Sequence, residues 1–157
     1  RMRLLPVIAA SLACLAIAGC KPAAQPAAQT AAAAGVSLSN ARLVLPIIAG
    51  DPAAAYFTAS NGGDKPSRIA SIAIAGAGMV MMHDTVTEGG KTGMAMLDSV
   101  EIPAHGSVTF APGGKHVMAE GLSEQVKPGG KAALTLILDD GVKVQAELPV
   151  ETAASGQ

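Results

Sequence analysis

Short apolar stretches separated by turn residues recur along the chain from Val36 to Pro149. Stretches of this length, in which apolar and polar side chains alternate, are typical of β-strands that bury one face. No segment of this region keeps the three- and four-residue apolar spacing of an amphipathic helix. The pattern therefore predicts an all-β domain, a Greek-key β-sandwich or small barrel. The expected strands are 36–45, 54–60, 66–75, 79–86, 92–97, 100–102, 107–110, 116–118, 132–138 and 142–149.

Three residue pairs that contain glycine predict tight turns between consecutive strands. They are Asn61-Gly62, Gly89-Gly90 and Asp140-Gly141. Two-residue hairpin turns need positive φ angles, which Gly and Asn adopt most readily. We therefore expect a β-hairpin at each pair.

The N-terminal region has the features of an export signal. A basic start, Arg1-Met2-Arg3, precedes an apolar stretch that is too short to span a bilayer as a mature helix. The residues before Cys20 resemble a bacterial lipobox, in which that cysteine becomes the lipidated first residue. We expect residues 1–19 to be a lipoprotein signal peptide that is removed. An ordinary secretory signal, giving a soluble periplasmic or secreted protein, is the alternative.

The expected domain lies between a low-complexity segment and a short polar tail. Residues 20–35 are rich in Ala, Pro and Gln and predict a tether that separates a lipid on Cys20 from the domain. Residues 36–150 form the predicted β domain, and residues 151–157 a polar tail. The membrane is therefore an expected partner through the N-terminal lipid.

Cysteine and charge content exclude several classes of protein. Cys14 lies in the signal and Cys20 would carry lipid, so the domain has no thiol for a disulfide or a blue-copper centre. Without Arg1 and Arg3 the chain keeps nine of its eleven Lys and Arg and all twelve Asp and Glu, a net charge of −3. A nucleic-acid-binding protein would show a basic stripe instead.

Enzyme motifs are missing from the sequence. It contains no Gly-x-Ser-x-Gly nucleophile turn, no His-Glu-x-x-His helix and no phosphate-binding loop. Asp139 and Asp140 lie in an expected hairpin turn, where turn geometry explains them better than acid–base chemistry does. We therefore expect no enzymatic activity.

Histidine and methionine are concentrated in one part of the chain. All three histidines and six of the seven methionines lie between residues 79 and 118. Thioether sulfur is a soft donor and imidazole a borderline one, and together they suit Cu(I) better than Mg²⁺, Ca²⁺ or Zn²⁺. Thioether and imidazole ligands are both neutral, so a bound ion keeps most of its positive charge. This favours a carrier, which must release its ion. The cluster predicts a Cu(I) site.

Two strand arrangements are open for the first half of this site. If His83 faces Met94 across a hairpin, the turn is centred between Glu88 and Gly89; if the turn is Gly89-Gly90 itself, His83 faces Met96. Residue spacing alone leaves these alternatives open.

The second half is local. His116 and Met118 point to the same side of an extended strand, and the turn at 112–114 can bring them beside His83. Met79, Met81 and Met82 are interpreted as core filling or a soft rim, and His105 as a turn residue.

The spacing His83, ten residues, Met94, twenty-one residues, His116-Val117-Met118 resembles the ligand pattern of PCu(A)C-type periplasmic copper chaperones. Segments 55–63 (AYFTASNGG), 100–104 (VEIPA) and 112–118 (PGGKHVM) resemble that family as well, and the likeness covers residues 36–149. It departs in two places. The Met81-Met82 pair precedes His83, where the family often has a methionine after the histidine, and His105 replaces the usual glycine.

The resemblance implies a cupredoxin-like β-sandwich with His83, Met94, His116 and Met118 as Cu(I) ligands. It also implies delivery of copper by ligand exchange to an acceptor protein, toward the CuA centre of cytochrome oxidase or another copper carrier. We therefore expect an exported, lipid-anchored metallochaperone of the periplasm with a monomeric domain. The alternatives are a copper-buffering protein for tolerance and a structural or interaction lipoprotein without metal.

Overall fold

The computed structural model describes residue 33 and residues 35–153. Its regular structure is entirely β, and each predicted strand is present with ends that shift by at most three residues. The strands are β1 (Val36–Leu45), β2 (Ala53–Asn61), β3 (Ser67–Ile74), β4 (Met79–Glu88), β5 (Lys91–Leu97), β6 (Val100–Ile102), β7 (Ser107–Phe110), β8 (His116–Glu120), β9 (Lys131–Leu138) and β10 (Lys143–Thr152).

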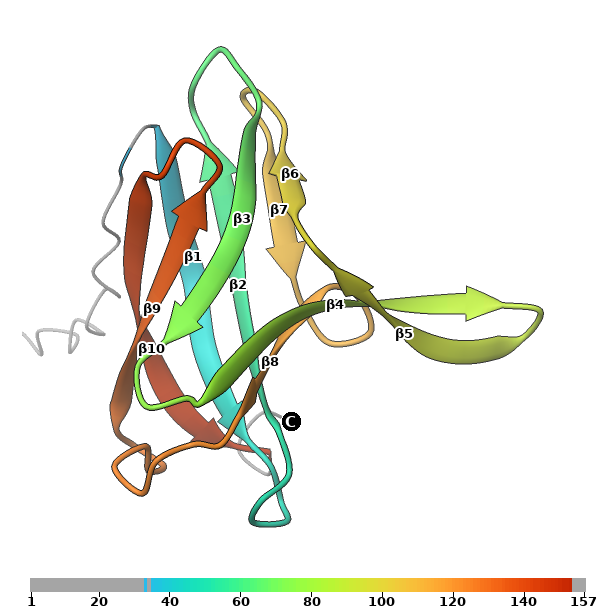
Figure 1. The fold of residues 1–157 in the computed structure, drawn as a ribbon, viewed down its shortest axis with the longest axis vertical. Coiled ribbons are helices and arrows are strands. Elements are labelled where there is room, and N and C mark those ends of the chain that lie inside the picture. The colour runs from blue at the N-terminus through green and yellow to red at the C-terminus, as the bar shows by residue number, and fades with distance from the viewer. Residues whose placement is uncertain (1–32, 34, 154–157) are drawn as a thin grey trace, which may run out of the picture.

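The strands form one hydrogen-bonded path that curls into two layers. Their order is β5-β4-β8-β2-β1-β10-β9-β3-β6, and β7 pairs with β2. β1 and β10 pair in parallel, and the other described pairs of strands are antiparallel. The layer of β3, β9 and β10 lies across β1 and β2 (Figure 1). The predicted all-β sandwich is therefore confirmed.

The core between the layers is mostly aliphatic, as expected from the small number of aromatic residues. Buried positions alternate with half-buried ones along the whole of β2. Phe57 on β2 lies directly opposite Phe110 on β7. Their rings stack with centroids 4.5 Å apart and planes 22° apart, and each residue is only 1% exposed. This pair is the aromatic centre of a core otherwise built from Val, Ile, Leu, Ala and Met82.

Two of the three predicted hairpin turns are confirmed. Gly89 and Gly90, with φ angles of 57° and 78°, join the antiparallel strands β4 and β5. Gly141, with φ of 82°, lies in the turn between the paired strands β9 and β10. Positive φ costs glycine little because it has no Cβ.

The third predicted hairpin, at Asn61-Gly62, is wrong. β3 pairs with β6 and β9 and does not pair with β2, so this turn carries the chain from one layer to the other. Asn61 is 3% exposed and organises the crossing. Its Nδ2 donates to the carbonyls of Lys65 and Ile102 at 2.7 and 3.3 Å, and its Oδ1 accepts from the Gly63 N–H at 2.9 Å.

The β4–β5 hairpin extends beyond the body of the sandwich (Figure 1). β4 is hydrogen-bonded to β5 on one side and to β8 on the other, and β8 connects it to β2. β5 is the last strand at this end of the sheet. The residues expected to bind copper therefore lie on three adjacent strands where the sheet leaves the body.

The expected signal peptide, Cys20 and nearly all of the tether lie outside the described residues. At the other end, β10 continues to Thr152, two residues into the expected polar tail. Within the described part of the chain, the structure contains no helix with the length and apolar character needed to cross a membrane.

Candidate metal centre

One row of side chains crosses the three strands at the centre of the candidate site. His83 on β4 lies directly opposite Met96 on β5 and His116 on β8. Directly opposed residues share a face of the sheet, with Cβ atoms about 5 Å apart. The two imidazole rings have centroids 5.9 Å apart. The structure thus brings together the two histidines that the sequence assigned to separate halves of the site.

The neighbouring rows place the other two expected ligands on either side of this pair. Met118 faces Met81 and lies two residues from His116, so it shares the face of that histidine. Met94 faces Thr85 and is therefore a diagonal neighbour of His83.

Direct opposition of His83 and Met94 is consequently wrong, because the turn is Gly89-Gly90 and the register pairs His83 with Met96. Diagonal neighbours on adjacent strands lie about 7–8 Å apart and remain within reach of long side chains. Methionine, with three rotatable bonds, is such a side chain. The corrected register therefore leaves Met94 able to reach an ion bound at His83.

The register places a whole set of soft donors on one face of the three strands. Met79 and Met94, two of its thioethers, are 56% and 64% exposed. Met82 points the other way and is 6% exposed in the core. Of the two interpretations of these methionines, core filling is thus confirmed for Met82, whereas the exposure of Met79 fits a soft rim. The donors on this face are Met79, Met81, His83, Met94, Met96, His116 and Met118.

The Gly114 carbonyl fixes the orientation of His116. It accepts a hydrogen bond from His116 Nδ1 at 2.9 Å. It also accepts from the Thr85 backbone N–H at 3.3 Å and from Thr85 Oγ1 at 3.2 Å. Because a carbonyl can only accept, Nδ1 carries the proton and Nε2 keeps the lone pair that a metal requires.

These contacts also hold β4 against the segment that precedes β8. A charged pair adds to them, since Lys115 Nζ lies 2.8 Å from Asp84 Oδ2. The sequence indicated a turn at Pro112-Gly113-Gly114 but gave no sign that its carbonyl would orient the neighbouring histidine. The sequence also gave no sign that Thr85 would donate hydrogen bonds to this carbonyl.

His83 has a buried ring nitrogen that lacks a hydrogen-bond partner. Among the buried side-chain nitrogen and oxygen atoms of the described residues, only Nδ1 of His83 has no hydrogen-bond partner. A buried polar atom left in this way costs about 1–3 kcal/mol. A metal ion bound to the imidazole would compensate this cost, and the donor set around the ring is one that suits a soft ion.

His105 lies apart from these donors, in the turn between β6 and β7, which confirms its interpretation as a turn residue. Its Nε2 is 2.9 Å from Asp64 Oδ1. Its φ angle of 52° is in the left-handed region that favours glycine. This backbone conformation agrees with the glycine that the resemblance implies at this position.

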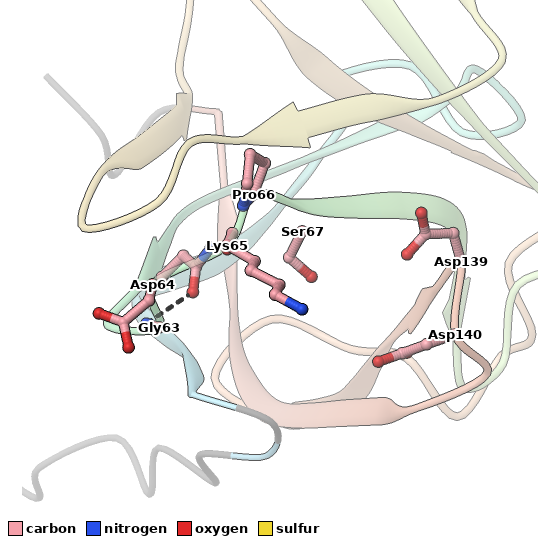
Figure 2. A pocket seen from close by; sticks show the side chains of 8 residues that line it. Gly63, Asp64, Lys65, Pro66, Ser67, Asp139 and Asp140 are labelled. Atoms are coloured by element: carbon pink, nitrogen blue, oxygen red, sulfur yellow. Dashed lines mark hydrogen bonds between the residues drawn. The ribbon is translucent and has the colours of Figure 1, made fainter.

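A hollow apart from these donors lies between the β2–β3 crossing and the β9–β10 turn (Figure 2). Its polar groups include Lys65, Asp139 and Asp140, and no thioether lines it. Asp140 Oδ1 accepts from the Val142 N–H at 2.9 Å, which supports its interpretation as a turn residue. Residues 33 and 35–153 contain no cluster of three or more His, Cys, Asp or Glu placed to hold a metal. The methionine-rich face is thus the candidate metal centre.

Comparison with known sequences identifies a family. Residues 36–150 match the family described as "Putative lipoprotein LpqE-like". A protein of Leifsonia xyli subsp. xyli, described as a "putative lipoprotein", is 31% identical over 99 residues. That match covers 62% of this chain and 60% of the relative, so the chain spans less than two thirds of the relative's length.

Solved structures with the same fold include copper-bound domains. The copper-bound PCuAC domain from PmoF2 has a TM-score of 0.65 at 24% identity, over 78% of this chain and 97% of the domain. The Cu(I) form of DR1885 from Deinococcus radiodurans has a TM-score of 0.61 at 30% identity, over 82% and 85%. The cupredoxin-like sandwich expected from the sequence is thereby confirmed. By the match over residues 36–150, this chain belongs to the LpqE-like lipoprotein family, with a domain that has the PCuAC fold.

Proposed function

We propose that this protein binds one Cu(I) ion through His83, Met94, His116 and Met118 and carries it to an acceptor outside the cytoplasm. The observation that carries the proposal is the cross-strand pairing of His83 with His116, with thioethers in the rows on both sides. The copper-bound forms of the similar domains support copper as the metal. The unpartnered Nδ1 of His83 supports a ligand at this ring.

The donor chemistry favours a carrier of Cu(I) over a permanent metal site. Two thioethers and two imidazoles are neutral, and soft donors select Cu(I) among the common metals. Met94 is 64% exposed, so an acceptor can approach the bound ion and replace this ligand. Ligand exchange then moves copper between proteins without a redox step. The resemblance to PCu(A)C-type chaperones supports the CuA centre of cytochrome oxidase as the destination.

Met118→Leu should lower Cu(I) affinity by at least about tenfold while the free energy of unfolding of the metal-free protein changes by less than about 1.5 kcal/mol. Leucine keeps the volume and apolarity of the side chain and removes only the sulfur. Competition with a Cu(I) chelator measures the affinity, and urea denaturation measures the stability. Met79→Leu, on the same face, is the matched control and should leave affinity unchanged. Equal affinities for Met118→Leu and the native protein would remove Met118 from the site.

We further propose that the mature protein is anchored to the membrane by lipid on Cys20 and faces the periplasm. The lipoprotein description of the family supports this proposal. Cys20→Ala should therefore move the protein from the membrane fraction to the soluble fraction, with Cu(I) affinity unchanged because the anchor is separate from the domain. Fractionation followed by immunoblotting measures this shift. Full retention of the variant in the membrane would contradict lipidation at Cys20.

A further inference from the structure

Two methionines on the donor face remain outside the proposed ligand set, although each lies directly opposite one of its members. Met96 faces His83 across the β4–β5 ladder, and Met81 faces Met118 across the β4–β8 ladder. Opposed positions bring Cβ atoms to about 5 Å. The Cβ atom of each of these two methionines is therefore about as close to that of a proposed ligand as the Cβ atoms of the two histidines are to each other.

Met81 and Met96 also share a second environment. Both line a hollow between β3 and the β4–β5 hairpin, together with Ser71, Asp98 and the otherwise buried Met82. Met96 is 64% exposed. The two methionines therefore lie both beside the proposed ligands and in the lining of the hollow.

We propose that Met81 and Met96 form a second, weaker Cu(I) site through which the ion enters and leaves the His83 site, an inference that rests on the proposed function. Thioethers select Cu(I), and the negative charge of Asp98 favours any cation in the hollow. The second site contains no imidazole, and it has two donors where the first has four. It therefore holds copper less tightly, as a transfer position requires.

The transfer is a stepwise ligand exchange that conserves electrons. The Met96 sulfur donates a lone pair to the ion as the Cu–N bond to His83 breaks, and the imidazole leaves as a neutral ring. The Met81 sulfur then replaces Met118 in the same way, and the ion separates from the His83 site when its remaining bonds to His116 and Met94 break. The ion stays Cu(I), and no proton is transferred. A new Cu–S bond compensates each of the two exchanged bonds, and the other two lost bonds leave the ion more weakly held in the second site.

Titration of the purified protein with Ag(I), a redox-inert monovalent ion that prefers the same soft donors, tests this site. The methionine methyl groups, labelled with carbon-13, are followed by NMR. The first equivalent should shift the methyl signals of Met94 and Met118, and the second those of Met81 and Met96. In the double variant Met81→Leu/Met96→Leu the second equivalent should no longer bind, while the first binds as in the native protein. Met79→Leu is the matched control and should bind both equivalents.

The outcomes separate this proposal from the one on which it rests. Binding of a single equivalent by the native protein would overturn the second site and leave the first intact. A second equivalent that persists in the double variant would also overturn it, because the ion would then lie elsewhere. Failure to bind any equivalent would refute the proposed function itself.

Discussion

His83→Phe is expected to lower Cu(I) affinity by at least about 100-fold. His83 is the centre of the candidate site, because it lies opposite His116 on one side and Met96 on the other. Loss of an outer-shell partner already costs a metal site about 10–100-fold in affinity, and His83 is proposed as a direct ligand. Phenylalanine keeps an aromatic ring in this place and removes both nitrogens. Competition with a Cu(I) chelator measures the affinity.

The same substitution should make the metal-free protein more stable, by about 1 kcal/mol. The buried Nδ1 of His83 lacks a hydrogen-bond partner in the described part of the chain, and the replacement removes that cost. Urea denaturation of metal-free protein measures the change. His105→Gln is the control, because His105 is bonded to Asp64 in a distant turn, and it should leave Cu(I) affinity unchanged. If the His83→Phe variant binds Cu(I) with native affinity, the copper site does not include His83.

Phe110→Ala is expected to lower the free energy of unfolding by about 3–5 kcal/mol. Phe110 stacks on Phe57 at the centre of the core, and the chain has no other phenylalanine. Truncation leaves a cavity that rigid strands on both sides cannot close. Urea denaturation measures the loss. Val86→Ala, in the projecting hairpin and 38% exposed, is the control and should change stability by less than about 1 kcal/mol. A loss below that value for Phe110→Ala would contradict the packing described here.

The strands could be predicted from the sequence because each one carries its own evidence. A strand with one buried face, such as β9 with its alternate buried positions, shows that face as a two-residue period. The Gly89-Gly90 turn could also be predicted from local sequence, because positive φ at two successive residues favours glycine. These features depend on neighbours in the chain and need no knowledge of distant partners.

Features that depend on distant residues were predicted less well. Asn61-Gly62 has the composition of a hairpin turn, but the partners of Asn61 include the carbonyl of Ile102, far along the chain. The sequence could not show that this asparagine supports a crossing between layers. The choice between Met94 and Met96 opposite His83 likewise depended on a shift of one residue in the turn, which spacing alone does not fix.

The candidate site depends both on features visible in the local sequence and on contacts between distant residues. The grouping of histidine and methionine was visible in the sequence because soft donors are scarce elsewhere in the chain. The pairing of His83 with His116 needed the structure, because it joins strands far apart in sequence. The hydrogen bond from His116 to the Gly114 carbonyl is local, but it depends on the backbone conformation of the turn, which the residue types alone do not fix.

X-ray absorption at the copper edge, measured on the protein loaded with one equivalent of Cu(I), tests the proposed site most directly. The two imidazoles and two thioethers proposed here should give a coordination shell with both nitrogen and sulfur scattering. Met118→Leu should reduce the sulfur contribution, whereas Met79→Leu should leave the spectrum unchanged. A shell of nitrogen and oxygen alone would contradict the proposal that this face binds copper through methionine.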